Sequence, residues 1–172
     1  MAGNNHSEAR EWVISILVAV VLAFVIKSFL FDFVLVQGSS MYPTLKNGER
    51  LVINKIEYEI GSPDYGDIVV LKHSANVDYV KRVIGKGGDT IEVKNSKVYR
   101  NGEMLDEPYV NTEKSYEDFA QVTVPEGKYF VMGDNRAVSL DSRYASVGFI
   151  DEDSIIGHVV FRFWPFTNFG TV

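Results

Sequence analysis

The chain has 172 residues, no cysteine, three histidines and a formal net charge of −6. This length accommodates one domain, or one domain with an anchor. The absence of cysteine excludes a disulfide scaffold, a thiol nucleophile and cysteine-based zinc sites. The acidic balance argues against a nucleic-acid partner, because phosphate binding requires clustered Lys and Arg. With three widely spaced histidines we also expect no metal and no cofactor.

The first clear pattern is an uncharged run at residues 12–26, which continues past Lys27 to Phe31. As a helix, residues 12–31 would span about 30 Å, the thickness of a bilayer core. The run is apolar on every side, whereas a surface helix has a polar face. It predicts a transmembrane helix with Lys27 near one end. A buried core helix is the alternative.

A cleavable secretory signal is a further interpretation of this run. It is disfavoured by the poorly charged segment before the run and by the lack of an Ala-x-Ala site after it. We therefore predict a short tail at residues 1–11, an anchor at residues 12–31 and a β-rich domain at residues 32–172. The flanking charges do not determine the orientation of the anchor.

Beyond Asp32 the sequence changes to short strands separated by turn residues. Their alternating and β-branched patterns predict a largely β domain with little helix. Asn101-Gly102 is typical of a tight hairpin turn. The predicted strands are residues 50–56, 67–71, 79–84, 90–94, 128–132 and 155–164, and the predicted hairpin is residues 97–105.

Three segments contain residues that could perform chemistry. Ser39 and Ser40 lie in a turn after the anchor, and Lys81 shares a strand face with Tyr79 and Val83. Residues 132–143 are rich in polar side chains and follow a predicted strand. The structural alternatives are a plain turn, an exposed edge-strand lysine and a hydrogen-bonded loop.

A serine nucleophile requires a base. Histidine is poorly supported, since His6 precedes the anchor, His73 lies in a loop-like stretch and His158 in a strand suits a structural role. Burial lowers the pKa of a lysine, so an inward-facing Lys81 could act as a neutral base in a Ser-Lys dyad. The motif Ser-x-x-Lys is absent, so the two residues would come from separate elements.

Three blocks of the sequence are Ser-Met-Tyr-Pro-Thr at residues 40–44, Tyr-Val-Lys-Arg-Val-Ile-Gly at residues 79–85, and residues 133–143, which begin with Gly-Asp-Asn-Arg. Together they resemble the motifs of bacterial type I signal peptidases, in the short single-anchor form of Gram-positive bacteria. Residues 161–166 are similar to the family's C-terminal ending. The blocks have the family's order and spacing, and the resemblance covers nearly the whole chain.

The resemblance implies a mainly β fold, an antiparallel sheet or barrel-like catalytic domain preceded by one transmembrane α-helix. It implies a single-pass protein of the cytoplasmic membrane, with its N-terminus inside and its catalytic domain on the outer face. The implied activity is endoproteolytic removal of signal peptides from exported preproteins, after small residues such as Ala-x-Ala. The expected partners are signal peptides and the phospholipid bilayer, and we expect the protein to function as a monomer.

By motif position, the resemblance makes Ser40 the nucleophile and Lys81 the general base. Ser139 would orient the lysine amine, and Asp141 with Arg143 would form a supporting ion pair. The Ser40 backbone N–H would stabilise the developing oxyanion. Apolar side chains near the site could form substrate pockets, or could be ordinary core positions; they are Val34, Val36, Met41 and Val80.

The sequence departs from the family pattern at several positions. Ser39 stands where relatives often have Asp or Glu, and Ala137-Val138 replaces more polar residues. Gly38 stands where some relatives have a serine, so a second oxyanion donor would come from elsewhere. The aromatic residues 161–169 could contact lipid or pack at a sheet edge, and both interpretations are open.

Two rival functions share parts of this pattern. Self-cleaving repressors use Ser-Lys chemistry, but they lack the apolar run and the Gly-Asp-Asn-Arg block. An inactive, membrane-anchored relative that acts as a binding module is the non-enzymatic alternative. Loss of cleavage on substitution of Ser40 and Lys81 would separate it from an enzyme.

Overall fold

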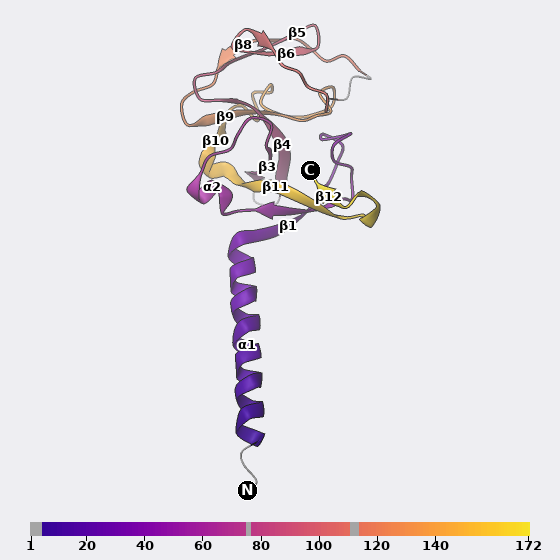
Figure 1. Ribbon diagram of the computed structural model, residues 1–172. Coiled ribbons are helices and arrows are strands. Elements are labelled where there is room, and N and C mark those ends of the chain that lie inside the picture. The colour runs from indigo at the N-terminus through magenta and orange to yellow at the C-terminus, as the bar shows by residue number, and fades with distance from the viewer. Residues whose placement is uncertain (1–4, 75–76, 111–113) are drawn as a thin grey trace.

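The structure, a computed structural model, describes residues 5–74, 77–110 and 114–172 (Figure 1). Helix α1 (Asn5–Leu30) projects from one end of a β-rich body and leads directly into strand β1 (Phe31–Leu35) (Figure 1). The helix begins at Asn5, before the predicted boundary at Trp12, so part of the predicted tail is helical. Phe31, predicted as the last helical residue, is the first residue of β1.

The side chains of α1 at positions 9–25 lie outside the protein core. Every residue from position 9 to position 25 is exposed, including Trp12 at 72% and Leu17 at 63%. The alternative of a buried core helix is therefore wrong. Within the described residues, no helix meets both the length and the apolarity needed to cross a membrane. The side chain of Lys27 lies outside the described part of the chain.

In the described part of the chain, eight strands form one antiparallel sheet with the order β1-β2-β11-β3-β4-β9-β10, and β12 pairs with β11. Hydrogen bonds do not close this sheet into a barrel among these residues, since β1 and β10 form its two edges. The predicted antiparallel sheet is thus confirmed in an open form. Besides β1, its strands are β2 (Arg50–Asn54), β3 (Ile68–Ser74), β4 (Val77–Lys86), β9 (Lys128–Met132), β10 (Ile150–Asp151), β11 (Ile155–Trp164) and β12 (Gly170–Thr171).

A second, four-stranded sheet lies at the end of the body far from α1 (Figure 1). Its order is β7-β6-β5-β8. The predicted hairpin turn is confirmed, because Asn101 and Gly102 connect β6 to β7 with φ angles of 54° and 81°. Its strands are β5 (Thr90–Lys94), β6 (Lys97–Arg100), β7 (Glu103–Met104) and β8 (Phe119–Thr123).

Most predicted strands are confirmed, and the differences lie at their ends. Strands β5, β9 and β11 have the predicted bounds, whereas β3 and β4 are longer and β3 includes His73. Strand β2 ends at Asn54 because the chain turns into the short helix α2 (Glu57–Ile60), which was not predicted. Two 3₁₀ turns, Glu152–Ser154 and Phe166–Asn168, flank β11.

The core divides into three apolar clusters around the large sheet. Alternate residues of β3 serve both faces, with Val70 in one cluster and Val69 in another. The third cluster lies between the two sheets and contains Phe130 and Ile91. The first cluster also contains Val36 and Met41, so the turn that carries Ser40 rests on packed apolar side chains.

Candidate active site

The pairing of β4 with β9 brings two of the motif blocks together. Arg82 lies across from Met132 in this antiparallel pair. Lys81 precedes Arg82 and Gly133 follows Met132, so β9 delivers its loop beside Lys81. Lys81 lies across from Val69 and is only 3% exposed. The prediction of an inward-facing lysine is confirmed, and the exposed edge-strand alternative is wrong.

Ser40 lies in a loop, residues 36–49, whose two ends are joined by hydrogen bonds. The Val36 N–H donates to the Glu49 carbonyl at 2.8 Å, and the Gly48 N–H donates to the Val36 carbonyl at 2.9 Å. We call this segment the nucleophile loop. The loop of the third block supports it, because the Asn135 N–H donates to the Ser40 carbonyl at 2.9 Å.

The side chains of Lys81 and Ser40 meet between these loops. Lys81 Nζ donates to Ser40 Oγ at 3.0 Å and to the Val80 carbonyl at 3.1 Å. Burial lowers the pKa of Lys81 to about 8, and the carboxylates of Asp141 and Asp134 oppose this shift. The neutral amine is therefore accessible near physiological pH, and its nitrogen is already within reach of the serine proton.

The two carboxylates near the amine are each paired with an arginine. Asp141 binds Arg143 through both oxygens, at 2.8 and 2.9 Å, and also accepts the Gly133 N–H at 3.0 Å. The predicted ion pair of Asp141 and Arg143 is thus formed, and it holds the Asp141 carboxylate in place near the Lys81 amine. Because its charge is matched by Arg143, Asp141 does not restore the full basicity of Lys81.

Asp134 forms the second pair, which the sequence analysis did not identify. It is fully buried and binds Arg82 through both carboxylate oxygens, at 2.9 and 2.7 Å. It also accepts the Thr44 hydroxyl at 2.5 Å. The Asp134 carboxylate therefore connects β4, the strand that carries Lys81, to the nucleophile loop. An acidic residue two positions after a buried strand was the available indication.

Ser139 lies in the site but does not have its predicted contact. It is 1% exposed, and its Oγ has no hydrogen-bond partner among the described residues. The predicted hydrogen bond to Lys81 is absent, because Nζ donates to Ser40 and to the Val80 carbonyl instead. A Cβ at Gly133 would collide with Ser139 Oγ and with the Ser40 carbonyl, so only glycine allows this close approach.

A cleft of about 370 Å³ opens beside the dyad. It runs between β1 with the start of the nucleophile loop on one side and β4 on the other. All four predicted pocket residues line it. The lining residues are Phe33, Val34, Leu35, Val36, Gln37, Gly38, Ser40, Met41, Asp78, Tyr79, Val80 and Lys81.

The backbone at the cleft offers one N–H, that of Ser40, as a donor to an oxyanion. Within the described part of the chain, the Ser40 N–H donates to no other group. Gly38 has a φ of +91°, a conformation that favours glycine, and its N–H is occupied by the Asn47 side chain at 2.9 Å. Gly38 therefore does not supply the second donor. Ser39 is exposed, and its carbonyl accepts from the Asn135 amide at 3.1 Å.

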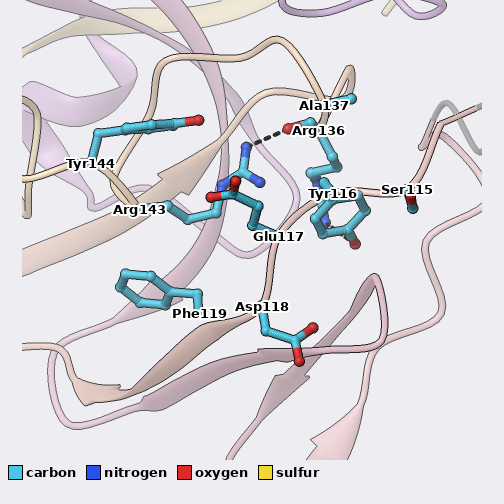
Figure 2. A pocket seen from close by; sticks show the side chains of 9 residues that line it. All are labelled: Ser115, Tyr116, Glu117, Asp118, Phe119, Arg136, Ala137, Arg143 and Tyr144. Atoms are coloured by element: carbon cyan, nitrogen blue, oxygen red, sulfur yellow. Dashed lines mark hydrogen bonds between the residues drawn. The ribbon is translucent and has the colours of Figure 1, made fainter.

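A larger hollow, of about 470 Å³, lies beyond the third block but contains neither Ser40 nor Lys81. Figure 2 shows Arg143 at its centre, donating to the Arg136 carbonyl at 2.7 Å. Arg136 is paired with Glu107 at 2.6 Å, so both cations already have carboxylate partners. Ala137 lines this hollow without taking part in either ion pair. The ion pairs beside this hollow therefore hold the third block in place. Ser40 and Lys81 line the cleft instead.

The structure describes the side chain of one histidine, His158. His158 contacts Glu57 at 3.1 Å and stacks on Tyr58, as expected of a structural residue. In the described ranges, no group of His, Asp and Glu side chains could hold a metal ion.

Comparison with known proteins identifies the family. The profile of the family "Signal peptidase, peptidase S26" matches residues 9–164. Signal peptidase IB of Staphylococcus aureus (strain Mu50) is 45% identical, with 94% of this chain and 93% of that protein covered. Signal peptidase I of Bacillus amyloliquefaciens is 49% identical, over 91% and 86% of the two chains.

A solved structure agrees with this match. The crystal structure of a signal peptidase I from Enterococcus faecalis superposes with a TM-score of 0.51 at 36% identity, covering 59% of this chain and 99% of that one. The chain therefore belongs to the signal peptidase family S26 and is an enzyme of the type I signal peptidase class.

Proposed function

We propose that this enzyme removes signal peptides from exported preproteins with a Ser40-Lys81 dyad and cuts after small residues, as in Ala-x-Ala. The observation that carries the proposal is the 3.0 Å contact between Ser40 Oγ and a buried amine with a pKa of about 8. A serine hydroxyl becomes a competent nucleophile when such a base can take its proton.

The proposed reaction begins with neutral Lys81. Its amine takes the proton of Ser40 as Oγ attacks the scissile carbonyl carbon, and the oxygen of that carbonyl becomes an oxyanion. The unoccupied N–H of Ser40 stabilises this charge. The Lys81 ammonium then gives its proton to the departing amine, which leaves an acyl-enzyme. Water, deprotonated by the same amine, hydrolyses the ester and releases Ser40.

The cleft supports a preference for small residues before the cut. Val36 and Met41 are buried, and Val34 and Val80 are half-buried beside the dyad. Branched and long apolar side chains line both walls of the cleft beside Ser40. An alanine side chain fits such a space, whereas a large one would require the walls to move.

We further propose that α1 anchors the chain in the bilayer, with the N-terminus inside and the catalytic domain outside. The exposed apolar side chains at residues 12–25 support this proposal, because such a surface is costly in water. Strand β1 connects the helix to the nucleophile loop over a short distance along the chain. Ser40 would then lie near the membrane surface, where a signal peptide emerges. The exposed side chains of Trp164 and Phe166 would face the same surface.

The decisive test is cleavage of a preprotein with an Ala-x-Ala junction by the full chain in detergent. Ser40→Ala should lose at least about 1000-fold in rate, and Lys81→Ala should lose a similar factor. Ser39→Ala is the matched control and should retain activity. Cleavage that survives in Ser40→Ala but not in Ser39→Ala would overturn the assignment of the nucleophile. A wild-type chain that binds the preprotein without cutting it would indicate a binding module.

A further inference from the structure

The nucleophile loop is held from two opposite directions. Lys81, Asp134 and Asn135 contact it from the catalytic side, as described above. Strand β11 contacts it from the other direction through Arg162, which is more than 110 positions further along the chain. The family motifs quoted above give this arginine no catalytic role. Its contacts nevertheless lie on the loop that carries Ser40.

Arg162 forms a buried ion pair with Glu49 at the end of the nucleophile loop. Its Nη1 lies 3.0 Å from Glu49 Oε2, and the side chain of Glu49 is 3% exposed. The same carboxylate accepts the Lys46 N–H at 3.0 Å and the Asn168 side-chain amide at 3.4 Å. In the described part of the chain, Arg162 is the one cation paired with Glu49. A carboxylate buried to this degree requires that partner.

Arg162 also holds Thr44, and this contact relates it to Ser40. Its Nη1 donates to the Thr44 carbonyl at 3.0 Å, while the Thr44 hydroxyl donates to Asp134 at 2.5 Å. Thr44 is therefore fixed between β11 and the carboxylate paired with Arg82. Backbone hydrogen bonds from Tyr42 to Ser39 and from Leu45 to Met41 make the intervening turn stiff. A shift of Thr44 would consequently displace Ser40.

We propose that Arg162 and Glu49 are positioning residues that hold Ser40 at attack distance from Lys81. Neither lines the cleft, so they act through the nucleophile loop and not by contact with the peptide. This inference rests on the proposed dyad and extends it to β11. Loss of the pair should reduce the rate of the chemical step, because small displacements of a reacting group are costly.

The test compares Arg162→Gln, Arg162→Lys and Glu49→Gln in the full chain in detergent, with the Ala-x-Ala preprotein as substrate. We expect Arg162→Gln to lower kcat about 10- to 100-fold with little change in KM. Arg162→Lys should fall between it and the wild type, because lysine keeps the charge but lacks the forked donors. The variant that combines Arg162→Gln with Glu49→Gln should have a kcat little lower than that of Arg162→Gln alone, since the two residues act as one unit.

Arg100→Gln is the matched control. Arg100 is half-buried, donates to the Ile84 carbonyl at 2.9 Å and stacks on Tyr65, but has no contact with the nucleophile loop. The Arg100→Gln substitution should lower Tm and leave kcat unchanged at a temperature well below Tm. If Arg162→Gln behaves in the same way, the pair is only structural and the proposal is wrong.

Two further outcomes are distinguishable. If Arg162→Gln does not fold, Glu49→Gln and Arg162→Lys provide the same comparison, and an unchanged kcat in both would overturn the proposal. If the wild-type chain itself does not cut the preprotein, the proposed function fails, and this inference fails with it. A wild type that cuts, beside variants with unchanged kcat, rejects the positioning role alone.

Discussion

The amine of Lys81 lies 3.0 Å from the hydroxyl of Ser40, and the two residues come from separate parts of the fold. Strand β4 carries Lys81, the proposed base, whereas Ser40, the proposed nucleophile, stands in a loop held by Asn135 and by β11. Lys81 is buried and Ser40 half-buried, and both line the cleft. A base in this setting is neutral at a lower pH than a free lysine, and this difference can be measured.

The pH dependence of cleavage should report the pKa of Lys81. Because only the neutral amine can accept the serine proton, kcat/KM should rise with pH through a midpoint of about 8. The measurement is a pH profile of preprotein cleavage, with Ser39→Ala expected to give the same profile. A midpoint near 6.5 would instead indicate a histidine base.

Replacing Lys81 with methionine should stabilise the fold below pH 8. The folded pKa of about 8 lies below the ordinary lysine pKa of 10.5, so the folded state disfavours the charged amine. The penalty is complete below pH 8 and disappears as pH rises toward 10.5. Lys81→Met should therefore gain up to about 3 kcal/mol at pH 7. Urea unfolding at pH 7 and pH 10 measures this difference, and equal gains at both pH values would contradict it.

Gly133→Ala should damage both stability and activity. The added Cβ would collide with Ser139 Oγ and the Ser40 carbonyl, and such overpacking costs about 1–3 kcal/mol. Displacement of the Ser40 carbonyl should also lower kcat. The double variant with Ser139→Gly removes one of the two collisions and should recover part of the stability. Thermal unfolding and cleavage rates test both effects, and an unaffected Gly133→Ala variant would contradict the observed packing.

Arg143→Gln should be strongly destabilising. It leaves the buried carboxylate of Asp141 without its cation, and breaking a buried pair in this way costs about 3–5 kcal/mol. Lys128→Gln is the comparison, because the Lys128–Asp151 pair is exposed and should contribute less than about 1 kcal/mol. Unfolding in denaturant compares the two variants. Similar losses in both would mean that the Asp141 site is more hydrated than its burial indicates.

The sequence alone predicted much of the fold, and its resemblance to the signal peptidases named the two residues of the proposed dyad. Alternation with period two identifies a strand such as β5, because one of its faces is buried, and a short apolar run identifies β9, which is buried on both faces. The same alternation turned Lys81 inward. The absence of cysteine and the poor placement of the histidines left that lysine as the available base. These conclusions depend on local pattern and composition, which are properties of the chain itself.

Tertiary structure decided which side chains meet. The register of β4 against β9 brings Gly133 beside Lys81, and no local pattern encodes that register. The fold also assigned the hydrogen bonds of the Lys81 amine to Ser40 and the Val80 carbonyl. Contrary to expectation, it left Ser139 Oγ without a partner among the described residues.

The buried ion pairs also could not be predicted from local sequence patterns. Asp134 with Arg82, and Glu49 with Arg162, join residues that are 52 and 113 positions apart. Each charge looks ordinary in the sequence, and only the folded chain removes it from water and provides its partner. The sequence by itself therefore determined the chemical groups, an inward lysine and a serine in a turn. The fold determined the distances and pairings that place them within reach of each other.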